Sequence, residues 1–171
     1  QPDGTAYIRF NNRFTEIEKV MSSDLVLMDI KTDESAQMIR IIIDSERPVT
    51  LSDTTGLMKL INNDESLQTL FPATHRIEIS SPGMGAELKQ PFQYRKNVGR
   101  TLEIKVVQDG KYIKRLGTLL EVMDTGILFQ EDEESYSIEF DAIKSAKIKI
   151  TFNSLINLLV FTDSFISKIE V

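Results

Sequence analysis

The first helix is predicted by apolar residues that recur every three to four positions. Over residues 12–22 this spacing places the apolar side chains on one face of a helix, where a neighbouring sheet can bury them. The side chains of this stripe are Phe14, Ile17, Val20 and Met21. Residues 1–11 carry no comparable pattern and are left unplaced.

Two segments rich in Ile and Val follow the helix and predict two strands, residues 25–30 and 38–44. The polar stretch 32–37 between them suits a hairpin connection. Pro48 ends the second strand, because proline has no N–H group to donate to a strand ladder.

A second helix is expected to begin at Ser52 or Asp53, which are both good N-cap residues, and to run to about Asn62. Its buried stripe would be Leu57, Leu60 and Ile61. A loop then leads to a third strand over residues 76–80, where apolar and polar side chains alternate.

These elements together predict an αββαβ domain of the α+β class over residues 12–82. Three strands with two helices on one face can close a small two-layer core.

The second half is predicted to be almost entirely β, as a separate domain over residues 83–152. Pro91 suits the first turn of a short helix that reaches Val98, and Gly99 would end that helix. Five short strands are expected at residues 101–107, 112–122, 127–130, 135–140 and 145–151. Short strands joined by tight turns indicate a small barrel, which leaves no open sheet edge.

The turns of this barrel have their own signals. Asp109-Gly110 is a strong hairpin signal, Gly117 indicates a bend or bulge, and residues 141–143 suit a single 3₁₀ turn. Residues 153–171 form an apolar tail, which could be a helix packed on one of the domains, a segment that binds a partner, or a foreign extension.

The composition excludes several kinds of chemistry. The 171 residues contain no cysteine and one histidine, so disulfides, thiolate nucleophiles and multi-histidine metal sites are excluded. The absence of cysteine favours a reducing cytoplasm. The longest apolar runs have four residues, residues 25–28 and 158–161, which is too short for a signal peptide or a membrane span.

Charge is distributed unevenly along the chain. The net charge is −6, which argues against a protein coated with basic residues but allows a local basic patch. Residues 89–115 contain 8 basic and 2 acidic residues, a net charge of +6, whereas residues 116–141 contain 8 acidic and no basic residues. This separation is the most informative feature of the composition.

The segment around the predicted domain junction resembles a known family. It reads Ile77-Glu-Ile-Ser-Ser-Pro-Gly83 and is followed by Leu88, Phe92, Tyr94, Arg95, Val98-Gly99-Arg100 and Gly117-Thr-Leu-Leu120. Over residues 12–152 the chain resembles the RimP family of bacterial ribosome maturation factors. That family joins an αββαβ domain to a small SH3-like (Sm-like) barrel.

Two features depart from the family pattern. After Gly83 the usual Asp-Arg-Pro is replaced by Gly85-Ala-Glu87, which removes a basic residue at the junction. The segment after Phe152 has no counterpart in the family.

The resemblance implies a ribosome maturation factor that assists assembly of the small (30S) ribosomal subunit by non-catalytic binding. Its partners would be ribosomal RNA and a basic ribosomal protein, in the cytoplasm. No cofactor, metal, membrane or small-molecule substrate is expected, and the protein is expected to be a monomer. Two alternatives stay open: an Sm-like RNA-binding module unrelated to the ribosome, and an interaction protein that self-associates through its tail.

The basic residues of the second half are the candidate contacts to RNA or the ribosome. They are Lys89, Arg95, Lys96, Arg100, Lys105, Lys111, Lys114 and Arg115. Clustered cations bind phosphates because each contact releases condensed counterions; the alternative is a solvated strand face. Arg100, Lys105 and the pair Lys114-Arg115 are the strongest candidates. No run of aromatic residues for base reading accompanies them; Tyr94 and Tyr112 could stack on bases but are expected to be partly buried anchors.

The acidic residues of the second half and the predicted domain junction are two further features of the sequence. The acidic residues Glu131-Asp-Glu-Glu134, Glu139 and Asp141 are expected to be a solvated turn or to dock a basic protein. The segment Ser80, Ser81, Pro82 and Gly83 suits a stiff interdomain bend, in which Gly83 can take a positive φ.

Catalysis is not expected. His75 is expected to be a surface or capping residue, although Ser80, Ser81 and Asp44 could be imagined as triad partners. Gly-x-Ser-x-Gly, P-loop and Gly-x-Gly-x-x-Gly motifs are all absent.

Overall fold

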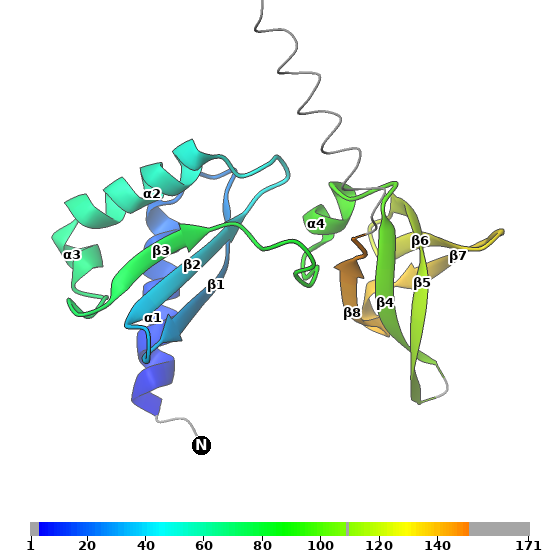
Figure 1. The fold of residues 1–171 in the computed structure, drawn as a ribbon, viewed down its shortest axis with the longest axis horizontal. Coiled ribbons are helices and arrows are strands. Elements are labelled where there is room, and N and C mark those ends of the chain that lie inside the picture. Colours follow the sequence, from blue (N-terminus) through cyan, green and yellow to red (C-terminus); the bar gives the residue numbers. More distant parts are fainter. Residues whose placement is uncertain (1–3, 109, 151–171) are drawn as a thin grey trace, which may run out of the picture. The chain divides into compact units, whose positions relative to one another are not determined.

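The computed structural model describes residues 4–108 and 110–150, with side chains described from residue 12 onward. The apolar tail at residues 153–171 and Asp109 of the predicted hairpin turn lie outside the described residues. The chain divides into two compact units, with the boundary between Pro82 and Gly83 (Figure 1). The structure is mixed α+β, as predicted.

The first unit contains a three-stranded sheet and three helices. Its elements are α1 (Gly4–Val20), β1 (Val26–Asp33), β2 (Met38–Asp44), α2 (Leu51–Asn63), α3 (Glu65–Gln68) and β3 (Arg76–Ser80). The strand order is β1-β2-β3. Strands β1 and β2 form the predicted antiparallel hairpin. Strand β3 runs parallel to β2, which requires a long crossover, and α2 and α3 supply it.

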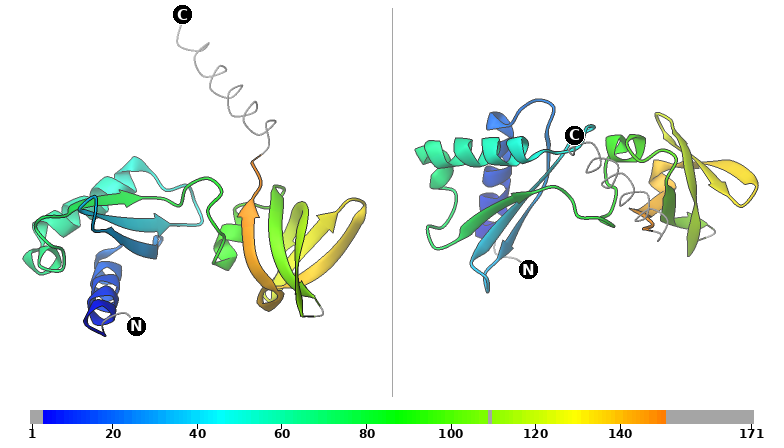
Figure 2. Two further views of the ribbon diagram at one scale, coloured as in Figure 1. Left: turned by 60° about the horizontal axis from the view of Figure 1, so that its bottom comes forward. Right: turned by 45° about the horizontal axis from the view of Figure 1, so that its top comes forward.

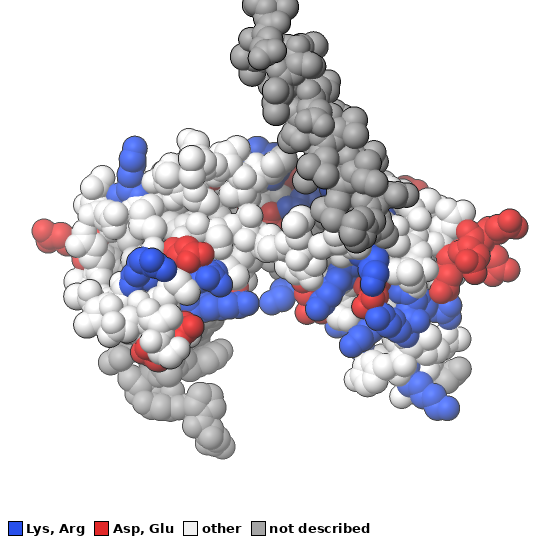
Figure 3. Space-filling model, viewed as in Figure 1, with Lys and Arg blue, Asp and Glu red and all other residues white. Residues whose placement is uncertain are grey.

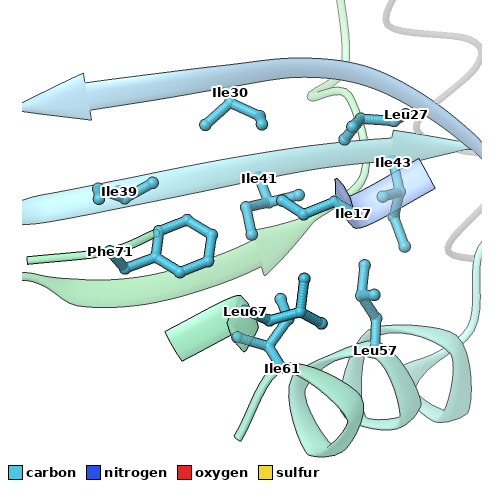
Figure 4. Close-up of a cluster of buried hydrophobic side chains, with 10 residues drawn as sticks. All are labelled: Ile17, Leu27, Ile30, Ile39, Ile41, Ile43, Leu57, Ile61, Leu67 and Phe71. Atoms are coloured by element: carbon cyan, nitrogen blue, oxygen red, sulfur yellow. The ribbon is translucent and has the colours of Figure 1, made fainter. Parts of the chain in front are cut away.

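The core of the first unit lies between the sheet and its helices. Ile39, Ile41 and Ile43 alternate along β2 and are fully buried, because alternate residues of a strand point to the same face. Ile17 of α1 and Ile61 of α2 pack against them (Figure 4). The two helices therefore share one face of the sheet, as the sequence predicts.

Strand β1 needs an irregularity to join this core. Leu27 and Ile30 are both buried although they are three residues apart, which regular alternation does not allow. The pairing with β2 shifts between Leu27 and Asp29. This bulge adds one residue and turns both apolar side chains to the helix side.

Helix α2 begins earlier than predicted, because its N-cap is Thr50 and not Ser52 or Asp53. The Thr50 hydroxyl accepts a hydrogen bond from the Asp53 backbone N–H at 3.3 Å, and the Asp53 carboxylate accepts one from the Thr50 N–H at 2.7 Å. This reciprocal capping box satisfies two N–H groups that a helix leaves unpaired. Arg47 joins Asp53 to Asp24, and its hydrogen bond is the main cause of the lowered pKa of Asp53.

Three other expectations about the first unit are wrong. Helix α1 begins at Gly4 and not at residue 12. Leu60 is 47% exposed, because α2 packs along the line of Leu57 and Ile61, which are four residues apart. The loop before β3 contains the short helix α3, whose N-cap Asp64 accepts hydrogen bonds from two backbone N–H groups.

The second unit is a five-stranded antiparallel sheet with one short helix. Its elements are α4 (Pro91–Arg95), β4 (Thr101–Gln108), β5 (Lys111–Val122), β6 (Gly126–Glu131), β7 (Glu134–Glu139), the 3₁₀ turn η1 (Phe140–Ala142) and β8 (Ile143–Ile148). The strand order is β7-β6-β5-β4-β8, and Figure 2 shows the sheet from two further directions. Among the described residues no ladder joins β7 to β8, so closure into an SH3-like barrel stays a prediction.

Strand β5 is the longest strand and pairs with two neighbours in turn. Its first part pairs with β4 up to Thr118, and from Thr118 onward it pairs with β6. Gly117 lies at this change of partner, where a Cβ atom would stand 2.1 Å from the Gln130 carbonyl oxygen. A bend at Gly117 agrees with the prediction, whereas the register shift lies further on, between Leu119 and Glu121.

Helix α4 is shorter than predicted and ends at Arg95, while Gly99 follows with a φ of 84°. Such a φ favours glycine because a Cβ atom would clash with the backbone. The core of this unit is formed by inward residues of β4 with residues of the other strands and of α4. It contains Tyr94, Leu102, Ile104, Val106, Leu119, Ile127, Phe129, Ile138 and Ala146.

Candidate nucleic-acid interface

The alternation along β4 decides which side chains of the second unit face solvent. Leu102, Ile104 and Val106 are buried, so Glu103 and Lys105 between them point outward. Residues directly opposite each other on paired strands share a face. The residues of β5 and β8 that pair with Glu103 and Lys105 therefore also point outward.

Four lysines surround one glutamate on this outward side, and we call them the cationic face. They are Lys105 of β4, Lys114 of β5, Lys147 of β8 and Lys149 directly after β8, around Glu103 of β4. Lys114 lies opposite Lys105, and Lys147 lies opposite Glu103. Glu87 pairs with Lys147 and so lies on the same side. Four positive charges against two negative charges leave the face with a net charge of +2. Figure 3 shows Lys and Arg side chains gathered over β8, β4 and β5.

Glu103 organises two of the four lysines. Its carboxylate lies 2.8 Å from the Lys114 Nζ and 3.9 Å from the Lys149 Nζ. The hydrogen bond from Lys114 is the main cause that lowers the pKa of Glu103, and the charges of Lys149 and Lys105 act in the same direction. Glu103 therefore stays ionised and holds Lys114 in place, while the lysines still outnumber it.

Arg115 follows Lys114 in the sequence but points to the opposite side of β5. Its Nη1 donates a hydrogen bond to the Glu131 Oε2 at 2.7 Å, and the Tyr136 hydroxyl donates to the same oxygen at 2.7 Å. The guanidinium carbon lies 5.5 Å from the centre of the Tyr136 ring. Arg115 therefore ties β5 to β6 and β7 and does not belong to the cationic face.

These contacts also shift the pKa values of Glu131 and Tyr136. The hydrogen bond from Tyr136, followed by that from Arg115, lowers the pKa of Glu131. Burial raises the pKa of Tyr136, and its hydrogen bond to Glu131 adds to this. On this side of β5 the positive charge of Arg115 is therefore balanced by the negative charge of Glu131 within the fold.

The other predicted cations lie elsewhere on the second unit. Lys89, Arg95, Lys96, Arg100 and Lys111 are all exposed. Lys89 follows Leu88, whose N–H donates to the Ala146 carbonyl of β8 at 2.8 Å. Arg95, Lys96 and Arg100 lie on or just after α4, and Lys111 begins β5 at the hairpin end. The eight predicted residues thus do not share one strand face.

Lys147 and Lys149 were missed as candidates. The charged segment that the sequence highlights ends at Arg115, and these lysines lie more than 30 residues further along the chain (147 − 115 = 32). Their alternation in the last predicted strand places them on one side of it. Only the pairing of β8 with β4 brings that side next to Lys105.

The two tyrosines considered for stacking have different environments. Tyr94 is 4% exposed, packs edge to face against Phe140 at 5.3 Å, and its pKa is raised to about 12 by burial. It is the anchor that was expected. Tyr112 is 75% exposed, so its interpretation as a buried anchor is wrong. It lies opposite Val107 on the outward side of the β4–β5 hairpin.

The acidic residues of the second unit lie mainly at the β6–β7 hairpin. Asp132, Glu133 and Glu134 are exposed, and Asp132 makes the turn with a φ of 54°. Figure 3 shows acidic side chains gathered at this end of the unit. Glu131 differs from its neighbours because it is committed to Arg115 and Tyr136.

The junction segment from Ser80 to Gly83 spans the boundary between the two units. The glycine with a positive φ is Gly85, at 78°, and not Gly83 as expected. The Ala86 N–H donates to the Gly83 carbonyl at 2.9 Å, so the turn lies just after the boundary. The backbone of Glu87 then pairs with that of Lys147 in an isolated antiparallel β-bridge.

His75 has contacts that differ from those of a catalytic triad. Its Nε2 lies 3.1 Å from a Glu34 carboxylate oxygen, and its Nδ1 lies 3.1 Å from the Thr74 hydroxyl. Neither contact involves Ser80, Ser81 or Asp44. His75 thus links the start of β3 to the β1–β2 turn.

Two further kinds of site are absent from the described part of the chain. Residues 4–108 and 110–150 contain no group of three His, Asp or Glu side chains that could hold a metal ion. No helix among them is long and apolar enough to cross a membrane.

Comparison with known proteins identifies a relative of this chain. A protein of Prosthecochloris aestuarii named ribosome maturation factor RimP is 25% identical over 114 residues. The chain is thus similar to a protein of the RimP family. This agrees with the resemblance in the junction sequence and with the mixed α+β structure. No protein-family model matches the chain. The match covers 63% of this chain and 64% of the relative, so the chain spans less than two thirds of the relative's length.

Proposed function

We propose that this protein assists maturation of the small ribosomal subunit by binding its precursor in the cytoplasm, without catalysing a reaction. The relationship to RimP, whose name denotes ribosome maturation, supports a role at the ribosome. The observation that carries the proposal is the cationic face, which concentrates a charge of +2 on a chain whose net charge is −6.

The chemistry of the cationic face fits the phosphate backbone of RNA. Lysine ammonium groups act as point charges toward phosphates, and their contacts release counterions. Within the described residues Lys105 and Lys147 form no ion pair, whereas Lys114 and Lys149 share the single charge of Glu103. Most of the positive charge is therefore available to a ligand.

We further propose that the second unit is an SH3-like barrel. The strand order β7-β6-β5-β4-β8 and the change of partner along β5 support this, because a strand that bends between two neighbours lets a sheet curl toward closure. The exposed acids of the β6–β7 hairpin would then face a basic ribosomal protein, since complementary charge raises the rate of encounter.

Gradient sedimentation of a cell extract tests the proposed function. The native protein should migrate with small subunits or their precursors. The double variant Lys105→Glu/Lys147→Glu changes the charge of the cationic face from +2 to −2 (2 − 4 = −2), and we expect it to remain at the top of the gradient. Higher salt should release the native protein as well.

A matched control changes the same total charge on the first unit. The double variant Lys31→Glu/Lys59→Glu should migrate with small subunits as the native protein does. Equal melting temperatures of both variants would show that neither loses its fold. If the native protein migrates only with free RNA, the alternative of an Sm-like module is correct. If the Lys105→Glu/Lys147→Glu variant still migrates with small subunits, the cationic face is not the contact surface.

A further inference from the structure

The outward side of the β4–β5 hairpin continues beyond the lysines into an exposed aromatic ring. Tyr112 lies two residues from Lys114 on β5, and Val107 lies two residues from Lys105 on β4. Residues two apart on a strand share a face and are separated by roughly 7 Å. The ring of Tyr112 therefore lies on the same surface as two lysines of the cationic face.

Burial distinguishes Tyr112 from the other tyrosines whose side chains are described. Tyr94 packs against Phe140 at 5.3 Å, and Tyr136 packs against Phe129 at 6.0 Å. Both rings have a place within the fold. Tyr112 is 75% exposed, and its cross-strand neighbour Val107 is 37% exposed. Within the described residues Tyr112 takes part in no ring–ring or cation–ring contact.

We propose that Tyr112 stacks on an unpaired base of RNA while Lys105 and Lys114 bind the adjacent phosphates. An aromatic ring beside cations is the arrangement that single-stranded nucleic acid requires, because every base has a flat face and every nucleotide carries a phosphate. Such stacking tolerates any sequence, which fits the lack of an aromatic run for base reading. This inference rests on the proposed function and adds that the RNA is single-stranded where it meets the hairpin.

This arrangement of Tyr112 and the two lysines distinguishes single-stranded from double-stranded RNA. In an A-form duplex the bases are already stacked inside the helix, and a side chain reaches mainly phosphates and 2′-hydroxyl groups. The lysines would bind either form, whereas Tyr112 gains a partner only in the single strand. We therefore predict that the protein prefers single-stranded over double-stranded RNA and that this preference depends on the Tyr112 ring.

The test measures binding of a labelled 12-nucleotide single-stranded RNA and of the matching duplex to the full chain. The native protein should bind the single strand more tightly. Tyr112→Leu keeps an apolar side chain but removes the ring, and it should weaken single-strand binding about five-fold or more while duplex binding is unchanged. Tyr112→Phe keeps the ring and should bind both RNAs as the native protein does. Because position 112 is exposed, equal melting temperatures are expected for all three proteins.

Intrinsic tyrosine fluorescence tests whether the RNA contacts the Tyr112 ring. The chain has four tyrosines and no tryptophan, so tyrosine emission is directly observable. Single-stranded RNA should quench part of this emission in the native protein, and the quenched part should be absent from Tyr112→Phe although that variant still binds.

Two results would overturn this proposal and leave the proposed function intact. In the first, Tyr112→Leu binds the single strand as tightly as the native protein, which would leave only phosphate contacts. In the second, Tyr112→Leu loses small subunits on the gradient but keeps its affinity for the single strand, which would assign Tyr112 to a protein contact. Failure of the native protein to migrate with small subunits would instead contradict the proposed function.

Discussion

The two sides of strand β5 show how neighbouring cations in one sequence come to have different uses. On the outward side Lys114 joins three other lysines around a single glutamate. On the opposite side Arg115 is matched by Glu131 and covered by the ring of Tyr136. The lysines on the outward side outnumber the acidic residues beside them and can bind a ligand, whereas Arg115 on the inward side is paired within the fold. Alternation along a strand therefore separates binding from stability one residue at a time.

The largest expected effect concerns the inward side. Gly117→Ala would bring a Cβ atom within 2.1 Å of the Gln130 carbonyl oxygen and 2.7 Å of the Phe129 ring. We expect a loss of about 3 kcal/mol of unfolding free energy, measured by urea denaturation, because neither neighbour can move without opening the β5–β6 ladder.

The matched control for this variant is Gly56→Ala in helix α2, where an added Cβ meets nothing within 4 Å. Gly56→Ala should leave stability unchanged or raise it by up to about 1 kcal/mol. Similar losses in both variants would contradict the close approach at Gly117.

The second prediction compares Arg115 with Lys114 directly. Arg115→Met removes a charge-assisted hydrogen bond and leaves Glu131 with one partner fewer, and it should cost about 1–2 kcal/mol of unfolding free energy. Lys114→Met should shift the thermal midpoint much less, because its pair lies on the surface. A larger loss for Lys114→Met would reverse the roles of the two sides.

The third prediction measures binding where the second measures stability. Lys105→Gln should weaken binding of single-stranded RNA a few-fold and reduce the slope of log affinity against log salt by about 1, as expected for one lost phosphate contact. Arg115→Met, assayed at a temperature where it is folded, should keep the native slope. Equal slopes for Lys105→Gln and the native protein would exclude Lys105 from the phosphate contacts.

The smallest expected effect is a dependence of stability on pH through Glu131 on the inward side of β5. Because Tyr136 and Arg115 lower the pKa of Glu131, its ionised form stabilises the fold at neutral pH. This contribution is lost as the pH falls below the ordinary range of a glutamate. The stability difference between the native protein and Glu131→Gln should therefore shrink from pH 6 to pH 3, as measured by urea midpoints. A difference that stays constant would show that Glu131 does not act through its charge.

Local patterns predicted most of the elements. The β1–β2 hairpin and strand β3 were found because their apolar residues and turn signals act over a few positions. The start of α2 was misplaced because Thr50 caps the helix through a hydrogen bond to Asp53, and several residues near this point can serve as caps. The bulge in β1 left no local signal, since Leu27 and Ile30 are both apolar in either register.

The candidate site could be predicted only in part. Lys105 and Lys114 lie within the basic segment and were identified from it. Lys147 and Lys149 join them through the β4–β8 pairing, which connects segments about 40 residues apart (147 − 105 = 42). Arg115 was grouped with Lys114 because counting charges along the chain does not distinguish the two sides of a strand.

Protection of lysines from chemical modification tests the central claim most directly. The protein is treated with a limiting amount of an acetylating reagent, alone and bound to small ribosomal subunits, and the modified positions are quantified by mass spectrometry. The account predicts that Lys105, Lys114, Lys147 and Lys149 become protected together in the complex, while Lys31 and Lys59 of the first unit keep their reactivity. Protection of the first-unit lysines with the four outward lysines still reactive would contradict it.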